Sequence, residues 1–294
     1  MPYRAKYSPY FFISPALLHF TIFWLFPIIF TFVLSFMNWN PLSPLSSMTF
    51  AGLKNYEAIF NSEEFWISVK NTFYFAIVSQ PITMIIGLSL ALLLKDIKGG
   101  SIFRTVIFLP VITSSVGISM IWSWMYNPTY GIINNVFSKI GLPKVNWLGE
   151  PATALPSIMV VDIWMWAGYH MVLFLAGLQS IPPDLYDAAK VDGATGISIT
   201  RHITLPLLKP IALFVIVMST IGALQIFDLV WVLSGMEYAG GPAMSTLVMV
   251  LEMYKVCFRR LLFTEASAMA VVFFLIVLIL CIIEFKLMKG GEYA

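Results

Sequence analysis

Six apolar runs, each long enough to cross a lipid bilayer, limit what this chain can fold into more than any other feature of its sequence. A hydrocarbon core about 30 Å thick needs about 20 residues of α-helix. The runs that reach this length are residues 11–37, 70–94, 103–126, 155–178, 207–233 and 266–287. Open strands would leave backbone groups unpaired in lipid, and the prolines inside these runs are tolerated as kinks because neighbouring helices satisfy the freed carbonyls. We therefore predict an all-α integral membrane protein with six transmembrane helices, kinked at Pro27, Pro81 and Pro110.

The low content of charged side chains supports the same conclusion. Only 11% of the 294 residues are charged and 59% are hydrophobic, whereas a soluble globular domain is about 25% charged. Lipid must therefore be the main solvent. The net charge of +2 favours neither a nucleic acid nor a strongly acidic partner. The two cysteines, Cys257 and Cys281, have neither the number nor the spacing of a disulfide framework or a metal site.

The first apolar run is predicted to be a retained spanning helix. It covers 27 residues, whereas the apolar part of a signal peptide has about 7–15 residues and is followed by a small-residue cleavage site, which is absent here. The run at 244–258 is shorter and contains Glu252 and Lys255. Its length favours a re-entrant or interfacial helix over a seventh span. The loops are too short for a separate soluble domain, so we expect a single domain over residues 1–294.

The distribution of basic residues predicts the orientation in the membrane. An even number of spans places both termini on one side. If that side is cytoplasmic, it carries ten lysines and arginines against seven on the other side, which agrees with the positive-inside rule. The ten are Arg4, Lys6, Lys95, Lys98, Arg104, Lys190, Arg201, Lys209, Lys286 and Lys289. We predict a multi-pass protein of the cell membrane (the inner or cytoplasmic membrane) with both termini in the cytoplasm.

The loop between the fourth and fifth spans, residues 182–206, is the most polar long stretch of the chain. Two prolines and Asp184 mark the start of a helix, and Gly193 stands where a left-handed residue would end it. Ala188 and Ala189 give this helix a shallow face that another protein surface can approach. From spacing alone, the loop is either a connecting helix between two spans or a docking element on the cytoplasmic side.

A specific motif in this loop resembles the EAA loop of ABC-importer permeases. The matching residues are Asp187, Ala188, Ala189, Gly193, Ile203, Leu205 and Pro206. The segments "FAGLKNYEAIF", "FRTVIFLPVITSSVGISMIWSWMYNPTYGIIN" and "WMWAGYHMVLFLAGLQSIPPDLYDAA" extend the resemblance over nearly the whole chain. They are similar to carbohydrate-uptake permeases, and more narrowly to the maltose-permease-type member of a heterodimer. The resemblance implies that the 184–196 helix sits in a groove of a cytoplasmic ATPase and transmits ATP-driven motion to the spans.

Four positions in the loop depart from the family pattern. Asp187 replaces the glutamate of the family and is one methylene shorter. Thr200 stands where phenylalanine is usual, which removes one apolar anchor for the ATPase groove. Gly196 and Ile199 stand where larger or charged residues are common. These departures concern the details of the contact and leave the predicted role unchanged.

Polar and aromatic residues inside the fourth and fifth spans are candidates for the substrate path, because such groups are costly in a bilayer unless they are used. Aromatic rings can stack on sugar rings, and carboxylates and amides can pair with sugar hydroxyls. The candidates are Asp162, Trp166, Tyr169, Ser219, Gln225 and Asp228. The resemblance implies that positions 166, 169, 219, 222, 223 and 226 line the sugar site. The alternative is that the aromatic residues are bilayer anchors, that Asp162 pairs with a neighbouring helix, and that Asp228 is solvated.

The sequence carries no recognisable catalytic site. A Walker A pattern for nucleotide phosphates does not occur, and His19, His170 and His202 lack the spacing of metal ligands. We predict that the chain is not an enzyme and holds no cofactor or metal. The resemblance implies that ATP and Mg²⁺ bind to a partner ATPase dimer. It also implies a second, homologous permease, an extracytoplasmic sugar-binding protein and a carbohydrate substrate.

Several other functions stay open at this point. The same machinery imports glycerol phosphate, polyols or oligouronides, although the candidate path residues include no lysine or arginine to hold an anion. An ion-coupled secondary transporter would show ionisable residues on discontinuous helices and internal repeats. Asp162 and Asp228 meet the first expectation, but no repeat is visible. A membrane enzyme would need a nucleophile or a metal constellation that the sequence does not offer.

Overall fold

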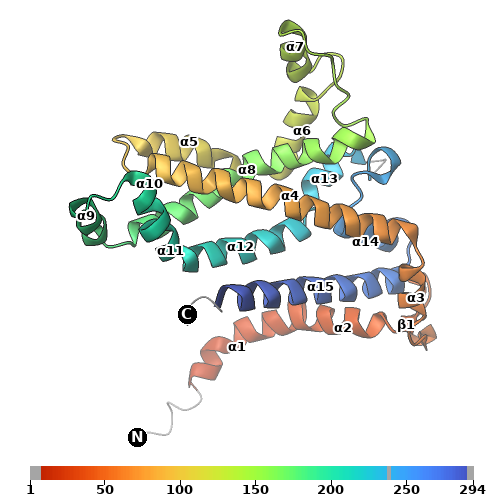
Figure 1. Ribbon diagram of the computed structural model, residues 1–294. Helices are drawn as coiled ribbons and strands as arrows, with labels where there is room; N and C mark the ends of the chain where they lie inside the picture. Colours follow the sequence, from red (N-terminus) through yellow and green to blue (C-terminus); the bar gives the residue numbers. More distant parts are fainter. Residues whose placement is uncertain (1–7, 237–239, 290–294) are drawn as a thin grey trace, which may run out of the picture. The chain divides into compact units, whose positions relative to one another are not determined.

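The computed structural model describes residues 8–236 and 240–289 and is almost entirely helical (Figure 1). Arg4 and Lys6, which contributed to the predicted orientation, lie outside these residues. Within them, the strands are β1 (Met37–Asn38) and β2 (Thr49–Phe50), which pair antiparallel with Met37 opposite Phe50. The predicted all-α membrane fold is confirmed.

Five helical segments of the described chain are long and apolar enough to cross a membrane. They are Tyr10–Leu34, Glu63–Leu94, Pro151–Gln179, Lys209–Leu233 and Phe263–Leu287. A sixth span exists if α5 (Gly100–Ile112) and α6 (Ser115–Met125) count as one, and these two helices meet at an angle of 96°. The segment at 244–258 is not among the spans. It forms the short α14 (Met249–Tyr254) and η6 (Lys255–Arg259).

The third span differs from the single helix predicted over residues 103–126, because the chain breaks at Thr113 and Ser114. Both residues have extended backbone angles, with ψ of 145° and 126°. The hydroxyl of Thr113 donates to the carbonyl of Leu109 at 3.0 Å, so the side chain occupies an acceptor that the helix would otherwise use. Pro110, just upstream, has no N–H to donate to the carbonyl of Val106, so the preceding turn also lacks one helical hydrogen bond. The break therefore has a local cause that a count of apolar residues does not detect.

The chain forms two compact units, and the first comprises residues 1–63 and 253–276. Its described helices are α1 (Ser8–Phe20), η1 (Thr21–Leu25), α2 (Phe26–Leu34), η2 (Leu45–Ser47), α3 (Lys54–Phe60), η6 and the first half of α15 (Phe263–Lys289). Asn55 fixes the end of α2 by donating to the carbonyls of Ser35 and Met37, both at 2.8 Å. The apolar side chains of residues 10–29 are exposed, as expected of a helix that faces lipid.

The second unit comprises residues 64–252 and 277–294 and holds the candidate site. Its long helices are α4 (Glu63–Leu94), α5, α6, α8 (Pro151–Gln179) and α12 (Lys209–Leu224), and the short α13 (Asp228–Leu233) follows α12. Its shorter ones are α7 (Ile132–Lys139), α9 (Pro183–Val191), α10 (Gly196–Ile199), η3 (Thr200–Thr204), α11 (Leu205–Leu207), η5 (Pro242–Met244) and α14. The gap between α12 and α13 interrupts the fifth span at residues 225–227, which is a second break not predicted from hydropathy.

Helix α8 is the centre of this unit. In its most apolar window 61% of the residues are buried, against 28% in the corresponding windows of Glu63–Leu94 and Lys209–Leu233. Two glycines allow close helix packing around it. A Cβ on Gly87 of α4 would lie 2.5 Å from the Cβ of His170, and one on Gly168 would lie 2.3 Å from the carbonyl oxygen of Ile107 in α5. Small residues at such crossings let helix backbones approach closely in membranes. The polar side chains of α8 are thereby held at fixed distances from α4 and α5.

Candidate functional site

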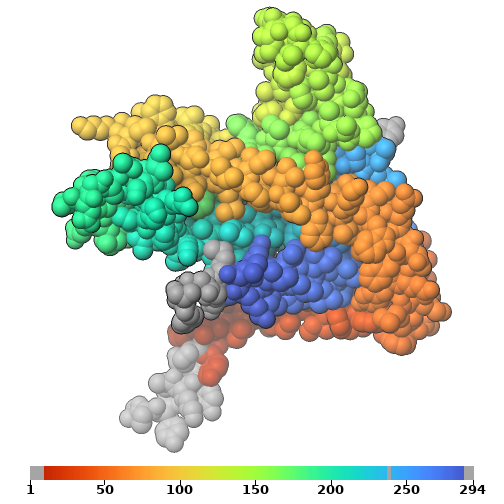
Figure 2. Space-filling view, in the orientation of Figure 1, coloured from red at the N-terminus to blue at the C-terminus, as the bar shows by residue number. Residues whose placement is uncertain are grey.

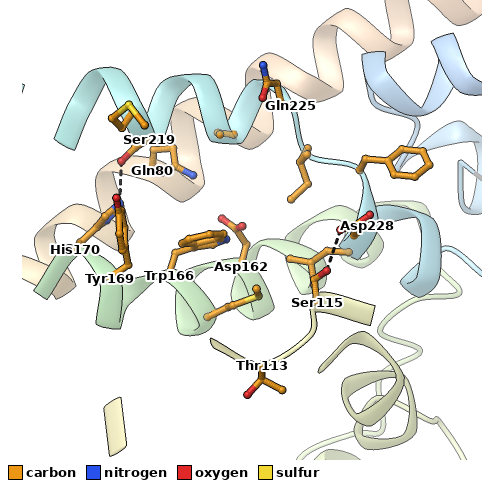
Figure 3. Close-up of a pocket in the computed structure, with 17 residues that line it drawn as sticks. Gln80, Thr113, Ser115, Asp162, Trp166, Tyr169, His170, Ser219, Gln225 and Asp228 are labelled. Atoms are coloured by element: carbon orange, nitrogen blue, oxygen red, sulfur yellow. Dashed lines mark hydrogen bonds between the residues drawn. The ribbon is translucent and has the colours of Figure 1, made fainter. Parts of the chain in front are cut away.

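The second unit contains a cavity of about 480 Å³ lined by residues of α4, α8 and α12 and by the two helix breaks (Figure 3). All six residues predicted for the substrate path line it. They are Asp162, Trp166, Tyr169, Ser219, Gln225 and Asp228. Gly222, Ala223 and Ile226, the positions implied by the family resemblance, line it as well. The structure therefore brings the predicted residues together in one place, and their binding of substrate stays a prediction.

The helical repeat of α8 explains why its three predicted residues share the cavity. Residues spaced by three or four positions lie on one helix face, and positions 162, 166 and 169 have this spacing. The rings of Trp166 and Tyr169 meet edge to face, with centroids 5.8 Å apart. Both rings reach the lining of the cavity, although they lie on the most buried span of the unit. They form an aromatic wall on the α8 side (Figure 3).

A short chain of hydrogen bonds joins α4 to the carboxylate of Asp162. Gln80 Nε2 donates to Ser79 Oγ at 3.2 Å, and Ser79 Oγ donates to Asp162 Oδ2 at 3.2 Å. The side chain of Asp162 is only 2% exposed. Within residues 8–236 and 240–289, Ser79 is the hydrogen-bond partner found for this carboxylate. The α4 contact therefore fixes one carboxylate oxygen and leaves the other for the cavity.

Two further hydrogen bonds lie at opposite ends of the cavity (Figure 3). Ser219 Oγ and His170 Nε2 are 2.8 Å apart and join α12 to α8. Ser115 Oγ donates to Asp228 Oδ2 at 2.9 Å and joins the start of α6 to the start of α13. The cavity is thus bounded by one polar pair between two spans and another between the two breaks.

Sequence reasoning missed some of the lining residues. Gln80, Thr113 and Ser115 belong to runs that were treated as uninterrupted apolar helices. The sequence Thr113-Ser114-Ser115, shortly after Pro110, carries a signal for a break, because serine and threonine hydroxyls compete with the backbone for hydrogen bonds. Ser79 and Gln80 are polar residues within the second apolar run, but the sequence does not indicate which residues they contact.

The loop at residues 182–206, the predicted coupling loop, forms the helix that its sequence predicts. Helix α9 starts at Pro183, and Gly193 ends it with φ of +77°. The amide of Ala194 donates back to the carbonyl of Ala189 at 2.9 Å, which closes the last turn. Asp187 pairs with Lys190 at 2.9 Å, and both side chains are about two thirds exposed, so the pair adds little stability. Figure 2 shows α9 and α10 exposed on the surface of their unit.

One expectation for this loop is wrong. The two alanines do not form one docking face, because Ala189 is buried at 8% exposure while Ala188 faces outward. The most exposed large apolar side chains of the segment are instead Val191 and Ile197, at 87% and 85%. Of the other matched positions, Gly193, Leu205 and Pro206 are exposed and Ile203 is half-buried.

Tyr186 attaches this helix to the rest of its unit. Its ring packs against a core that includes Leu178 and Leu208, and its hydroxyl lies 3.4 Å from Thr204 Oγ1. Lys95 Nζ lies 3.9 Å from the centre of the ring. Arg104 holds the backbone of the same turn by donating to the carbonyl of Leu94. Through Lys95, the loop between α4 and α5 is therefore in direct contact with Tyr186 of α9.

Comparison with known proteins places this chain in a family. The sequence matches the family described as binding-protein-dependent transport system inner membrane component over residues 83–287. It is 36% identical over 292 residues to a probable ABC transporter permease protein of Bacillus subtilis, with 98% of each chain covered. It is 37% identical over 247 residues to the trehalose/maltose transport system permease protein of Thermococcus litoralis, covering 84% of this chain and 82% of the relative.

A third relative and a solved structure agree with this placement. The lactose transport system permease protein of Rhizobium radiobacter is 35% identical over 279 residues, with 93% of this chain and 91% of the relative covered. The fold matches a chain in the crystal structure of a bacterial ABC transporter involved in the import of the acidic polysaccharide alginate. The TM-score is 0.82 over 98% of this chain and 97% of the other, at 23% identity. At that identity the likeness shows the fold alone.

Proposed function

The chain belongs to the family of binding-protein-dependent transport system inner membrane components, and from this premise we propose that it is the transmembrane permease subunit of an ATP-driven ABC importer. We propose that it translocates a sugar or oligosaccharide that an extracytoplasmic binding protein delivers. The relatives named for trehalose/maltose and lactose transport support the substrate class. Each covers more than four fifths of this chain.

The cavity is the observation that carries the sugar assignment. An aromatic wall of Trp166 and Tyr169 stands beside two carboxylates, two amides and the hydroxyls of Thr113, Ser115 and Ser219 within one space of about 480 Å³. Apolar sugar ring faces stack on aromatic rings, and sugar hydroxyls pair with such polar groups. Ligand sites combine apolar walls with a few placed polar groups in this way.

The energy for transport comes from a partner in this proposal. Helix α9 would sit in a groove of a cytoplasmic ATPase dimer that binds ATP and Mg²⁺, and a second, homologous permease would complete the path. The exposed side chains of Ala188, Val191 and Ile197 offer apolar contacts for such a groove. The chain itself would perform no catalysis. Both termini would lie on the cytoplasmic side of the membrane.

Two other functions have weaker support from these observations. The same machinery for glycerol phosphate or an oligouronide would bring an anion beside Asp162 and Asp228, and a polyol would leave the aromatic wall without a ring to stack on. The two helix breaks fit an ion-coupled secondary transporter, whose sites lie on discontinuous helices. Broken helices occur in both kinds of transporter, however, and the family match favours the binding-protein-dependent class.

The test is ATP-dependent uptake by the complete complex in proteoliposomes, with a panel of trehalose, maltose, lactose and longer oligosaccharides. We expect uptake to require both the ATPase subunits and the binding protein. Gly193→Asp should abolish uptake and the co-purification of the ATPase, since it places a charged side chain at a left-handed position of the coupling loop. Uptake by the permease subunits alone would refute the proposal.

A further inference from the structure

The side chains around the cavity have an unbalanced charge. The titratable groups among its lining residues are Asp162, Tyr169, His170 and Asp228, and none of the seventeen lining residues is lysine or arginine. His170 is engaged with Ser219, and Asp228 is exposed and held by Ser115. Asp162 is therefore the buried acidic group whose carboxylate is left for the contents of the cavity.

The geometry of Asp162 leaves one oxygen without a protein donor. Oδ2 accepts from Ser79 at 3.2 Å. Oδ1 has no hydrogen-bond partner within residues 8–236 and 240–289 and is not among their buried unpaired atoms, although the residue as a whole is only 2% exposed. Figure 3 shows the carboxylate directed into the cavity beside Trp166. A buried carboxylate is costly unless donors surround it, so this oxygen is a strong acceptor for any hydroxyl that enters.

An anionic sugar would be repelled by the same carboxylate. A uronate or phosphate group in the same space would lie near Asp162 with no cation among the lining residues to offset it. Like charges repel more strongly beside buried protein groups than in bulk water, and the usual response is that one of the two groups must take up a proton. A neutral sugar carries no such cost and brings the O–H donors that Oδ1 lacks.

We infer that Asp162 is a specificity-determining residue, which makes this cavity accept uncharged sugars through their hydroxyl groups and exclude uronates and sugar phosphates. This inference rests on the proposed function, because it names the substrate class of the same site. It also gives Ser79 and Gln80 a role as positioning residues, which hold Oδ2 and so aim Oδ1 into the cavity.

A purely structural role for Asp162 makes a different prediction. If the residue only links α4 to α8 through Ser79, its amide analogue can serve as well, because an amide oxygen also accepts the hydroxyl proton. Selection by charge needs the carboxylate. Asp162→Asn and Asp162→Glu therefore separate the two roles, since only the second keeps the charge.

The first measurement reads the charge of the cavity without any sugar. The complete transporter is prepared with Cys257→Ser, Cys281→Ser and Trp166→Cys and with no other cysteines. The new thiol lies one helical turn from Asp162. Its rates of reaction with a trimethylammonium methanethiosulfonate and with a sulfonate methanethiosulfonate are compared. We expect Asp162→Asn to lower the cation-to-anion rate ratio at least about fivefold and Asp162→Glu to preserve it. An unchanged ratio in Asp162→Asn would overturn the inference.

The second measurement tests selectivity with matched sugars. Maltose, trehalose and lactose are each compared with the uronic acid made by oxidising a C6 hydroxymethyl group, in titrations of the purified complex without the binding protein. We expect the neutral sugar that binds to have a Kd at least about tenfold lower than the Kd of its uronate. In Asp162→Asn, this ratio of Kd values should fall to about threefold. Equal binding of a neutral sugar and its uronate would overturn the inference. A complex in which Asp162→Asn lowers the cation-to-anion rate ratio as expected, but which takes up no sugar, would instead refute the proposed function.

Discussion

Lys95 Nζ lies 3.9 Å from the centre of the Tyr186 ring, so the turn after α4 is in direct contact with α9, the predicted coupling helix. A cation over an aromatic face contributes about 0.5–1 kcal/mol at an exposed site. The same ring packs into the core of its unit. Motion imposed on α9 by an ATPase would therefore reach α4, whose Ser79 and Gln80 hold Asp162 at the cavity.

Replacement of Tyr186 by leucine is expected to uncouple ATP hydrolysis from transport. The apolar packing is largely kept, but the ring that contacts Lys95 is lost, so basal ATPase activity of the complex should persist while sugar uptake falls several-fold. Tyr186→Phe keeps the ring and should retain most uptake, because it loses only the long 3.4 Å contact with Thr204.

Lys95→Ala should give a milder form of the same defect, measured as the ratio of sugar transported to ATP hydrolysed. Lys98→Ala is the matched control, since this lysine is exposed on the same turn. Equal ratios for Lys95→Ala and Lys98→Ala would exclude a role for the Lys95–Tyr186 contact in coupling.

Substitution at Gly193 should weaken the coupling loop through backbone strain alone. Its φ is +77°, and a Cβ there would meet no atom within 4 Å, so Gly193→Ala is expected to cost about 1 kcal/mol from the left-handed conformation. Gly196→Ala is the control, because that position is equally open but has no positive φ. Affinity for the ATPase, measured by pull-down over a concentration series, should fall for Gly193→Ala and stay unchanged for Gly196→Ala.

Replacing Gly168 by alanine should destabilise the second unit. The added Cβ would lie 2.3 Å from the carbonyl oxygen of Ile107, and relief of such overpacking costs about 1–3 kcal/mol. We expect the thermal midpoint in detergent to fall by several degrees. Gly222→Ala provides the comparison, because its Cβ meets open space at the cavity. It should leave the midpoint unchanged and alter the apparent sugar affinity. A midpoint for Gly168→Ala equal to that of the parent would show that α5 and α8 can separate at no cost.

Loss of the aromatic wall should weaken sugar binding. Trp166→Ala and Tyr169→Ala are each expected to raise the apparent KM for uptake about tenfold or more, because each removes one ring that lines the cavity. Trp164 lies on the same helix but packs edge to face on Trp122, with centroids 5.6 Å apart, and does not line the cavity. Trp164→Ala should leave the KM unchanged. An unchanged KM in both cavity variants would remove these residues from the substrate path.

Local sequence patterns predicted much of the fold and the site. The length of the apolar runs was enough to predict membrane-spanning helices, and the spacing of Asp162, Trp166 and Tyr169 placed them on one face of α8. The signal for α9 was equally local, since the prolines at its start and Gly193 at its end act within one helical turn.

The features that were missed depend on competition between local groups or on contacts distant in sequence. The break at Thr113 arises because a hydroxyl takes a carbonyl from the backbone, which hydropathy cannot register. The burial of Ala189 is set by the elements packed beneath α9, and the contact of Lys95 with Tyr186 joins residues separated by several helices. The position of Ser79 beside Asp162 likewise requires the packing of α4 on α8, which Gly87 permits.

The two helix interruptions, at 113–114 and 225–227, lie in the walls of the cavity, where each separates a longer helix from a shorter one. The segments beyond them, α6 and α13, pack against each other and are bridged by Ser115 and Asp228. A joint movement of α6 and α13 would leave the backbone hydrogen bonds within α5 and α12 in place. Exposure of the cavity to the opposite side of the membrane would then require no unwinding of a helix, but it would require repacking of the buried core that Ile118, Leu229 and Val230 share with α8.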